Sequence, residues 1–372
     1  MSADSVQSKV AAVILKALEI AKNEGQLPCD VPSQLTLDRP KNRDHGDYAT
    51  SIALALSKSA NLQPGVIAKV IVKTLTDNKL LTPAGISKVD IAGPGFINIT
   101  LESASQGVVV TEILTSGRKF GTSTLLAGKK INLEFVSANP TGPLHLGHTR
   151  WAAVGDSLGR VLAAAGAQVS REFYVNDRGN QMDLFGASLR AAALGKPRPE
   201  DGYHGEYIED LAKEIVKSNP KFTELAESES ISAFTQAGYK LQLDQQRKVL
   251  DNFGTHFDTW FSERSLYEND FFNHSLDKLK KQGHVYEQEG AIWLRTTDFG
   301  DDKDRVMIKS DGTFAYFASD SAYYVSKKER GFNLCIYMLG ADHHGYVGRV
   351  KALAACAGDD PEKDVEVLIG QM

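Results

Sequence analysis

The stretch EFVSANPTGPLHLGH, residues 134–148, decides how this 372-residue sequence is interpreted. It overlaps a short apolar, β-rich run, INLEFV (131–136), and it opens a segment with helical periodicity from about His145 to Ala165. A second β-rich run, VSREFYV (169–175), follows. Strand, helix and parallel strand in this order predict the start of a nucleotide-binding α/β sheet.

The same alternation returns near the end of the sequence. FNLCIYMLG (332–340) predicts a strand, ADHHG (341–345) a loop, and YVGRVKALAACAG (346–358) a helix that ends at Gly358. Residues from about 190 to 290 are helical in pattern and charged, so we predict a helical insertion there. The fold class predicted for 131–372 is therefore α/β, with a Rossmann-like parallel sheet interrupted by that insertion.

The first hundred residues have a different character. Apolar residues at three- and four-residue steps predict a first helix that Gly25 ends, and two more helical stretches follow at 48–60 and 66–81. VDIAGPGFINITL (89–101) then predicts a short β-rich piece, in which Gly93, Pro94 and Gly95 mark a tight turn. We expect a small α+β N-terminal domain over 1–116 and a linker over 117–130, where Gly, Lys, Ser and Thr break all periodicity.

Composition excludes several classes of protein. With 42 Lys+Arg against 47 Asp+Glu, the net charge of -5 rules out a uniformly basic surface that coats nucleic acid, though not a local basic patch. Three cysteines without a C-x-x-C pair support neither a disulfide framework nor a thiolate zinc site. Charged residues interrupt the apolar N-terminal segment, unlike a signal peptide or a membrane span. We expect a soluble, cytoplasmic protein that contacts no membrane and no DNA.

His145-Leu146-Gly147-His148 stands where a strand ends and a helix begins. Helix N-termini present free N–H groups and a positive dipole that suit a phosphate, and residues at i and i+3 share one face of the first turn. Gly147 lets a base or a phosphate approach the backbone closely. The pattern favours stabilisation of charge on an attacked α-phosphate, and the alternative is a pair of helix-capping or surface histidines.

The whole stretch from Glu134 to His148 resembles the arginyl-tRNA synthetase family, in its bacterial type. The resemblance is carried further by DHGDYAT (44–50), GPGFINI (93–99), EFYVNDRGNQ (172–181), FDTWFSERSLY (257–267), GTFAYFASDSAYY (312–324) and LGADHHGY (339–346). It implies a class I enzyme, an arginine–tRNA ligase. Such an enzyme activates L-arginine with ATP and Mg²⁺ to arginyl-adenylate and transfers it to the 3'-terminal adenosine of tRNA(Arg).

Matching residues to the family assigns expected roles. The expected catalytic residues are His145, Gly147 and His148. The expected ATP-binding residues are Pro140, Thr141, Gly142, Pro143, Leu144, His145, Leu146, Gly147, His148, Gly340, Asp342 and His344. The expected arginine-binding residues are Glu134, Ser137, Asn139, Tyr316, Asp320 and His343, with the roles of Asp342 and His343 left open between them.

Asp320 is the first choice as partner of the guanidinium, because a carboxylate can accept its rigid fork of donors bidentately. The alternative is that Asp320 caps a helix and that Ser137 and Asn139 only shape the turn before Pro140. Phe96 and Asn98 match family positions that meet an unpaired tRNA base, which an aromatic ring stacks and an amide reads. A core role for Phe96 is the alternative.

No resident metal is expected beyond Mg²⁺ brought with ATP, since the adjacent His343 and His344 point different ways and no ligand cluster is visible. The second class I signature, K-M-S-K or a variant, is absent. We therefore expect a truncated chain that lacks its C-terminal part and is an incomplete catalytic portion, which could be inactive alone. We also expect a monomer. The alternatives are a synthetase-like RNA- or protein-binding module without catalysis, and a small nucleotidyltransferase.

Overall fold

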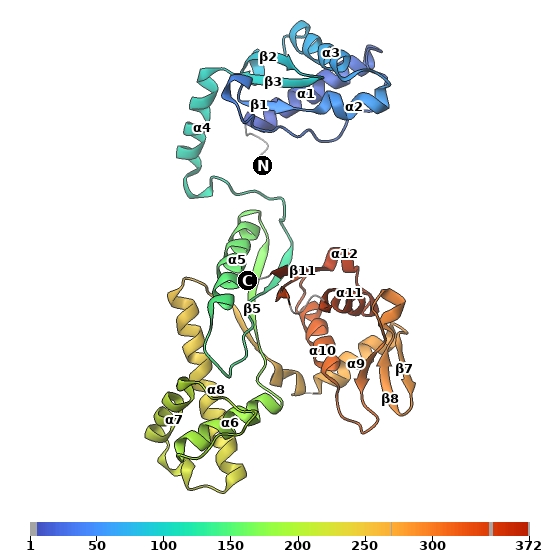
Figure 1. Cartoon of the computed structure of the whole chain (residues 1–372). Helices are drawn as coiled ribbons and strands as arrows, with labels where there is room; N and C mark the ends of the chain where they lie inside the picture. Colours follow the sequence, from blue (N-terminus) through green and yellow to red (C-terminus); the bar gives the residue numbers. More distant parts are fainter. Residues whose placement is uncertain (1–5, 269, 342–344, 371–372) are drawn as a thin grey trace. The chain divides into compact units, whose positions relative to one another are not determined.

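The computed structural model describes residues 6–268, 270–341 and 345–370, and the chain divides into two compact units, 1–125 and 126–372 (Figure 1). Each unit has its own apolar core. They are described separately below.

The first unit is a three-stranded antiparallel sheet packed with helices. Its elements are α1 (Val6–Asn23), β1 (Tyr48–Thr50), α2 (Ile52–Ala60), α3 (Pro64–Asp77), β2 (Ile86–Ala92), β3 (Phe96–Leu101) and α4 (Ser103–Ser116), with the strands in the order β1-β3-β2. The buried stripe of α1 faces the core, as its periodicity predicts. The hairpin β2–β3 turns through Gly93 and Gly95, both with positive φ.

Two helices of the first unit differ in their boundaries from the prediction. Residues 48–50 form β1 instead of the start of a helix, because they pair with β3, where Ala49 lies opposite Asn98. The hydroxyl of Thr50 then accepts the N–H of Ile52 at 3.3 Å, a donor without a partner inside its own helix. The next helix, predicted over 66–81, begins instead at Pro64, which suits a first helical position, and ends at Asp77.

The second unit is built on a five-stranded, fully parallel sheet with the order β11-β10-β4-β5-β6. Its elements are β4 (Lys130–Glu134), α5 (Leu146–Ala164), β5 (Gln168–Val175), α6 (Asn180–Ala193), α7 (Glu206–Ser218), α8 (Glu227–Asn252), β6 (Thr259–Ser262), α9 (Phe271–Lys281), β7 (Val285–Gln288), β8 (Ala291–Leu294), β9 (Arg305–Ile308), α10 (Tyr316–Glu329), β10 (Leu334–Gly340), α11 (Tyr346–Cys356), α12 (Pro361–Asp364) and β11 (Val365–Gly370). The predicted α/β class is confirmed.

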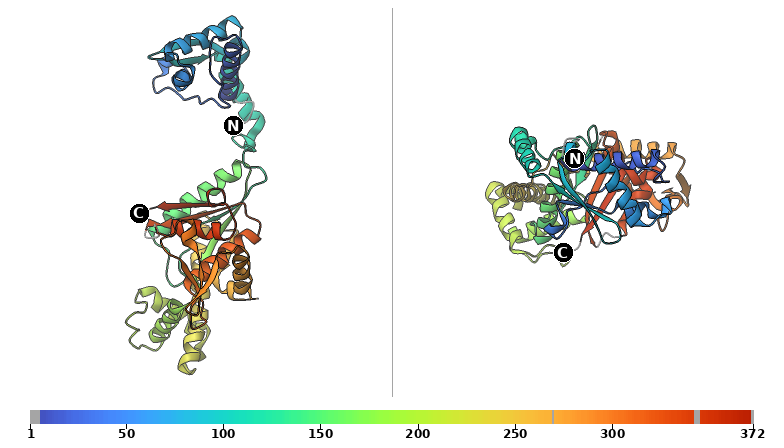
Figure 2. Two further views of the ribbon diagram at one scale, coloured as in Figure 1. Left: turned by 90° about the vertical axis from the view of Figure 1, so that its right-hand side faces the viewer. Right: turned by 90° about the horizontal axis from the view of Figure 1, so that it is seen from above.

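The predicted helical insertion over 190–290 is continuously helical in character only as far as Asn252, and of the α-helices only α9 (Phe271–Lys281) follows within this range among the described residues. Helices α6, α7 and α8 gather in a group of their own (Figures 1 and 2), but β6 then returns to the parallel sheet beside β5. Strands β7, β8 and β9 form a separate antiparallel sheet. Strand β6 was not predicted, because a four-residue strand of half-buried residues within a charged segment shows too little periodicity to detect.

The order of the strands places a topological switch beside β4. The chain leaves β4 through α5 to reach β5 on one side, whereas β10 lies on the other side of β4. Ligands of open α/β sheets bind at the carboxyl ends of the strands at such a switch. The last strand, β11, pairs with β10 along its whole length from Val365 to Gly370.

Candidate active site

A cavity of about 690 Å³ opens at the carboxyl ends of the parallel strands. Its walls come from the segment after β4, the start of α5, and the ends of β5, β10 and β11. Ser137, Asn139, His145, Gly147, His148 and Gly340, six of the residues expected from the sequence, are brought together there. Trp151 and Tyr174 also line this cavity, although the sequence analysis did not single them out.

The two histidines cap the helix that carries them. His145 is the N-cap of α5, and its Nδ1 accepts the N–H of Gly147 at 3.1 Å, while Nδ1 of His148 accepts the N–H of His145 at 3.2 Å. The two histidines therefore do cap a helix, which the sequence analysis gave as the alternative to a role in binding. Capping does not compete with a role in binding, because a neutral imidazole that accepts at Nδ1 carries its proton on Nε2. Each ring therefore keeps one N–H donor beyond its capping bond.

His148 is held neutral. Half-burial lowers its pKa to about 4, and the neighbouring His145, whose ring centroid is 3.8 Å away, acts in the same direction. Protonation would also remove the acceptor that receives the N–H of His145.

The titration of His148 predicts a loss of stability in acid. A group whose folded pKa lies below its unfolded value of 6.5 stabilises the fold fully above pH 6.5, and this contribution is lost as the pH falls towards 4. His148→Gln keeps an acceptor at this capping position without the titration. We expect the unfolding free energy to drop between pH 7 and 4.5 by about 1 kcal/mol more in the parent chain than in the variant, given screening of a half-exposed ring.

Chemical denaturation of both chains at the two pH values measures this difference. An equal drop in both chains would show that His148 does not titrate in this window.

The segment after β4 turns sharply into the cavity. Val136 and Ser137 both have positive φ, +68° and +44°, and the N–H of Ser137 donates to the carbonyl of Phe135 at 2.9 Å. Positive φ is unfavourable for a β-branched residue, so Val136 is held in a strained conformation by its surroundings. The hydroxyl of Ser137 accepts the N–H of Tyr174 at 3.1 Å and donates to Glu134 at 3.3 Å, which secures the turn on both sides.

The following loop is held by the helical group. Gln246 of α8 donates to the carbonyls of Asn139 (3.0 Å) and Gly142 (2.9 Å), and Tyr207 of α7 donates to that of Thr141 (2.9 Å). Sequence reasoning missed both positioning residues, because they lie 66 and 107 residues from the loop atoms they bind and no local pattern marks them.

Not all of the expected ATP-binding residues reach the cavity. Pro140, Thr141, Gly142, Pro143, Leu144 and Leu146 are absent from its wall. Thr141 is buried, Leu146 is 84% exposed, and Leu144 lines a different, apolar cavity with Phe253. These six residues shape the loop and the helix start that present the histidines.

Three carboxyl groups, Glu134, Glu263 and Asp320, are near enough for the charges of the first two to act on the third. Burial raises the pKa of Asp320 to about 6, against a hydrogen bond from Tyr346 and the charge of Arg349, and the other two carboxylates raise it further. Burial likewise raises the pKa of Glu263, although Tyr174 and Ser319 donate to it. Repulsion of the kind that acts on Asp320 would be relieved by a bound cation.

Glu263 was not predicted as a site residue. It belongs to FDTWFSERSLY, a motif quoted for the family resemblance, but an acidic residue in a charged segment carries no signal of its own.

Tyr316 stands apart from the histidines. It begins α10, its side chain is 94% exposed, and it lines a neighbouring cavity of about 410 Å³ together with Glu263 and Ser319. Asn176 lines both cavities and so connects them. Asp342, His343 and His344 lie outside the described residues. Within the described part of the chain, no three His, Cys, Asp or Glu side chains gather as a metal site requires.

In the first unit, Phe96 is exposed and not a core residue. Its side chain is 42% exposed, and Asn98 lies on the same face of β3, since Ile97 and Ile99 between and beyond them are fully buried. The core alternative for Phe96 is thereby wrong. An aromatic ring and an amide next to each other on an exposed strand face can meet an unpaired base.

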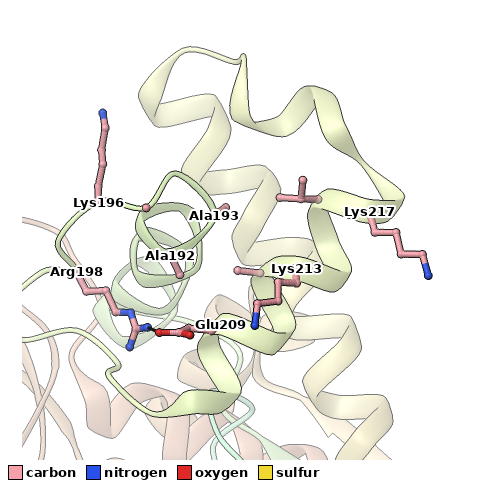
Figure 3. A pocket seen from close by; sticks show the side chains of 10 residues that line it. Ala192, Ala193, Lys196, Arg198, Glu209, Lys213 and Lys217 are labelled. Carbon is pink, nitrogen blue, oxygen red and sulfur yellow. Dashed lines mark hydrogen bonds and ion pairs between the residues drawn. The ribbon is translucent and has the colours of Figure 1, made fainter.

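A further cavity, of about 610 Å³, lies between α6 and α7 (Figure 3). It carries several cations, but Arg198 is paired with Glu209 at 2.7 Å. Lys196 and Lys217 point away from each other in Figure 3. The cations do not converge on one point, as a built anion site would require.

Comparisons with known proteins give two family matches and several similar relatives. Residues 109–369 match the family described as tRNA synthetases class I (R), catalytic domain, and residues 5–101 match the arginyl tRNA synthetase N terminal domain. The chain is 52% identical over 367 residues to an arginine–tRNA ligase of Renibacterium salmoninarum and 49% identical to one of Paenarthrobacter aurescens. Each match covers 98% of this chain and 66% of the relative, so the chain spans about two thirds of their length.

Solved structures are similar as well. A putative arginyl-tRNA synthetase of Campylobacter jejuni superposes with a TM-score of 0.65 at 39% identity, over 71% of this chain and 59% of that one. The arginyl-tRNA synthetase of Thermus thermophilus gives a TM-score of 0.70 at 20% identity, over 98% and 65% of the two chains, and shares the fold. Among the described residues no helix has the length and apolar character needed to span a bilayer.

Proposed function

Because the chain belongs to the class I arginyl-tRNA synthetase family, we propose that it forms the arginine- and ATP-binding part of an arginine–tRNA ligase. That enzyme would activate L-arginine with ATP and transfer it to the terminal adenosine of tRNA(Arg). One observation carries the proposal: the cavity with His145 and His148 at a helix start shares Asn176 with a second cavity, which Glu263 lines, and burial raises the pKa values of Glu263 and Asp320.

The histidine end of the cavity suits the nucleotide. The α-phosphate would lie at the start of α5, where free backbone N–H groups and the helix dipole favour an anion. The Nε2–H groups of His145 and His148 would donate to the phosphate oxygens as negative charge grows there during attack by the arginine carboxylate. Because capping orients both rings beforehand, little reorganisation would be needed in the transition state.

The carboxyl end suits the guanidinium. Asp320 and Glu263 offer planar acceptors. Their raised pKa values indicate that the ionised carboxylates lack full compensation by positive charge, which a bound arginine would supply. Ser137 and Asn139, which line the histidine cavity, would then meet the amino and carboxylate groups of the substrate. This assignment directs the carboxylate of arginine towards the α-phosphate.

Magnesium would enter with ATP and lower the charge repulsion between the triphosphate and its attacker. The described residues that line the histidine cavity include no carboxylate, so its donor set fits a metal carried by phosphate oxygens and water. No protein side chain is proposed as its ligand.

The first unit would contact tRNA(Arg) through Phe96 and Asn98, whose shared exposed face supports stacking and edge recognition of one base. We expect a monomer. The three cysteines are free, which agrees with a reducing, cytoplasmic compartment.

Titration calorimetry with arginine, with and without ATP, tests the proposal, with lysine as the competitor. We expect arginine to bind and lysine not to displace it, since a compact ammonium cannot fill a site built for a bidentate fork. A folded chain that binds neither amino acid would instead favour the binding-module alternative.

A further inference from the structure

Two acidic residues lie side by side in the centre of the parallel sheet. Glu134 ends β4, Glu172 lies in β5, and the two are Cα partners in the register of these strands. The two residues are 7% and 0% exposed. Adjacent buried carboxylates repel each other strongly unless each has its own cation.

Helix α10 supplies those cations from one face. Tyr323, Lys327 and Arg330 follow at steps of four and three, so they project towards the same side. Both terminal nitrogens of Arg330 contact the carboxylate of Glu172, and the hydroxyl of Tyr323 donates to it at 2.7 Å. Glu172 is therefore fully satisfied without Lys327.

Lys327 is committed to Glu134. Its Nζ lies 2.6 Å from Oε2 of Glu134, and the side chain is completely buried. The same nitrogen lies 3.8 Å and 4.2 Å from the ring centroids of Tyr337 and Tyr323, whose faces stabilise a desolvated ammonium. A fully buried lysine with a carboxylate and two aromatic rings around it is a built arrangement, since an unpaired one would be strongly unfavourable.

The ion pair of Lys327 and Glu134 is connected by a further hydrogen bond to a residue that lines the histidine cavity. The other oxygen of Glu134, Oε1, accepts from the hydroxyl of Ser137, and Ser137 closes the strained turn 135–137. The series Lys327, Glu134 and Ser137 thus connects α10 to the residue that enters the cavity. A strained turn persists only where its surroundings over-determine it.

We propose that Lys327 is a positioning residue of the amino-acid site: it orients Glu134, and through Glu134 the turn at Ser137, to receive the α-ammonium group of the substrate. The inference rests on the proposed function. The arginine carboxylate must reach a phosphate beside the histidines, so the ammonium group on the adjacent carbon would lie near Ser137, which lines the same cavity. Lys327 itself touches no ligand.

Affinities of Lys327→Met for three ligands test the assignment: arginine, agmatine, which lacks the carboxylate, and argininic acid, which lacks the α-ammonium group. We expect at least tenfold weaker binding of arginine and agmatine and less than a twofold change for argininic acid. Lys328→Met is the matched control, because this neighbouring lysine pairs with Asp359 and Asp364. It should change none of the three affinities.

Equal weakening of all three ligands would mean general loosening of the fold, and unchanged arginine affinity would mean that Lys327 positions nothing; either result overturns the inference. If Lys327→Met does not fold, Lys327→Gln, which keeps an N–H donor towards Glu134, carries the same comparison. A parent chain that binds arginine no better than lysine defeats the proposed function itself, and the ligand part of this inference with it.

Hydrogen–deuterium exchange gives a readout that needs no ligand. We expect Lys327→Met, but not Lys328→Met, to speed exchange in the peptide spanning residues 131–140, because the turn loses its anchor. Unchanged exchange in that peptide would overturn the inference whether or not arginine binds.

Discussion

Replacing Asp320 by alanine is expected to weaken arginine binding at least a hundredfold. The carboxylate is half-buried, and a guanidinium left without its bidentate partner in such a site loses about 3 kcal/mol or more. Titration calorimetry of the parent chain and the variant measures the loss. Asp277→Ala is the control, since this residue pairs only with Lys280 on an exposed face of α9 among the described residues, and its loss should leave arginine affinity unchanged.

The same group gives a pH signature. Because the pKa of Asp320 is raised from 3.8 to about 6, the folded chain holds a proton between these values that the unfolded chain releases, so this group adds stability as the pH falls from 6 to 4. Arginine affinity should move the opposite way and decline below pH 6, where the carboxylate is neutralised. Affinity that is independent of pH between 5 and 7 in the parent chain would remove Asp320 from the guanidinium site.

Gly155→Ala is expected to destabilise the second unit by about 3 kcal/mol. Gly155 lies inside α5, and a Cβ there would meet the ring of Phe135 at 2.3 Å. Phe135 is fully buried and packs at a tilt against Phe257 with ring centroids 4.5 Å apart, so the ring has little room to retreat. Alanine favours a helix over glycine by about 1 kcal/mol, but overpacking of a rigid aromatic core is larger.

Gly107→Ala is the matched substitution. This glycine also lies inside a helix, α4, yet a Cβ there has nothing within 4 Å. We expect its unfolding free energy to rise by up to about 1 kcal/mol. Chemical denaturation of both variants decides the matter, and a stability of Gly155→Ala equal to that of the parent would mean that Phe135 can move. Because Phe135 is the first residue of the turn that contains Ser137, the loss of stability in Gly155→Ala should be accompanied by weaker arginine binding.

Local patterns were sufficient for much of the second unit. The periodicity of 131–175 predicted β4, α5 and β5 with nearly correct ends, and 332–358 predicted β10 and α11. The histidines were placed correctly at a helix start for the same reason, since a strand, a turn and a helix each leave a pattern within a few residues. The short strands β1 and β6 were missed, because three or four residues carry too little pattern to outweigh their helical neighbours.

Sequence alone determined the family, the parallel α/β class, the position of the histidine helix and the candidates at Glu134, Ser137, Asn139 and Asp320, because these depend on residue types in contiguous motifs. Only the tertiary structure decided that the histidines cap their own helix, that Glu263 joins Asp320, that Gln246 holds the loop after β4 and that Lys327 pairs with Glu134. The residues that pair in this way are 57 to 193 positions apart in the sequence. The capping by the histidines depends only on the direction of their side chains. Contacts of that kind arise when strands and helices pack, and no local pattern encodes them.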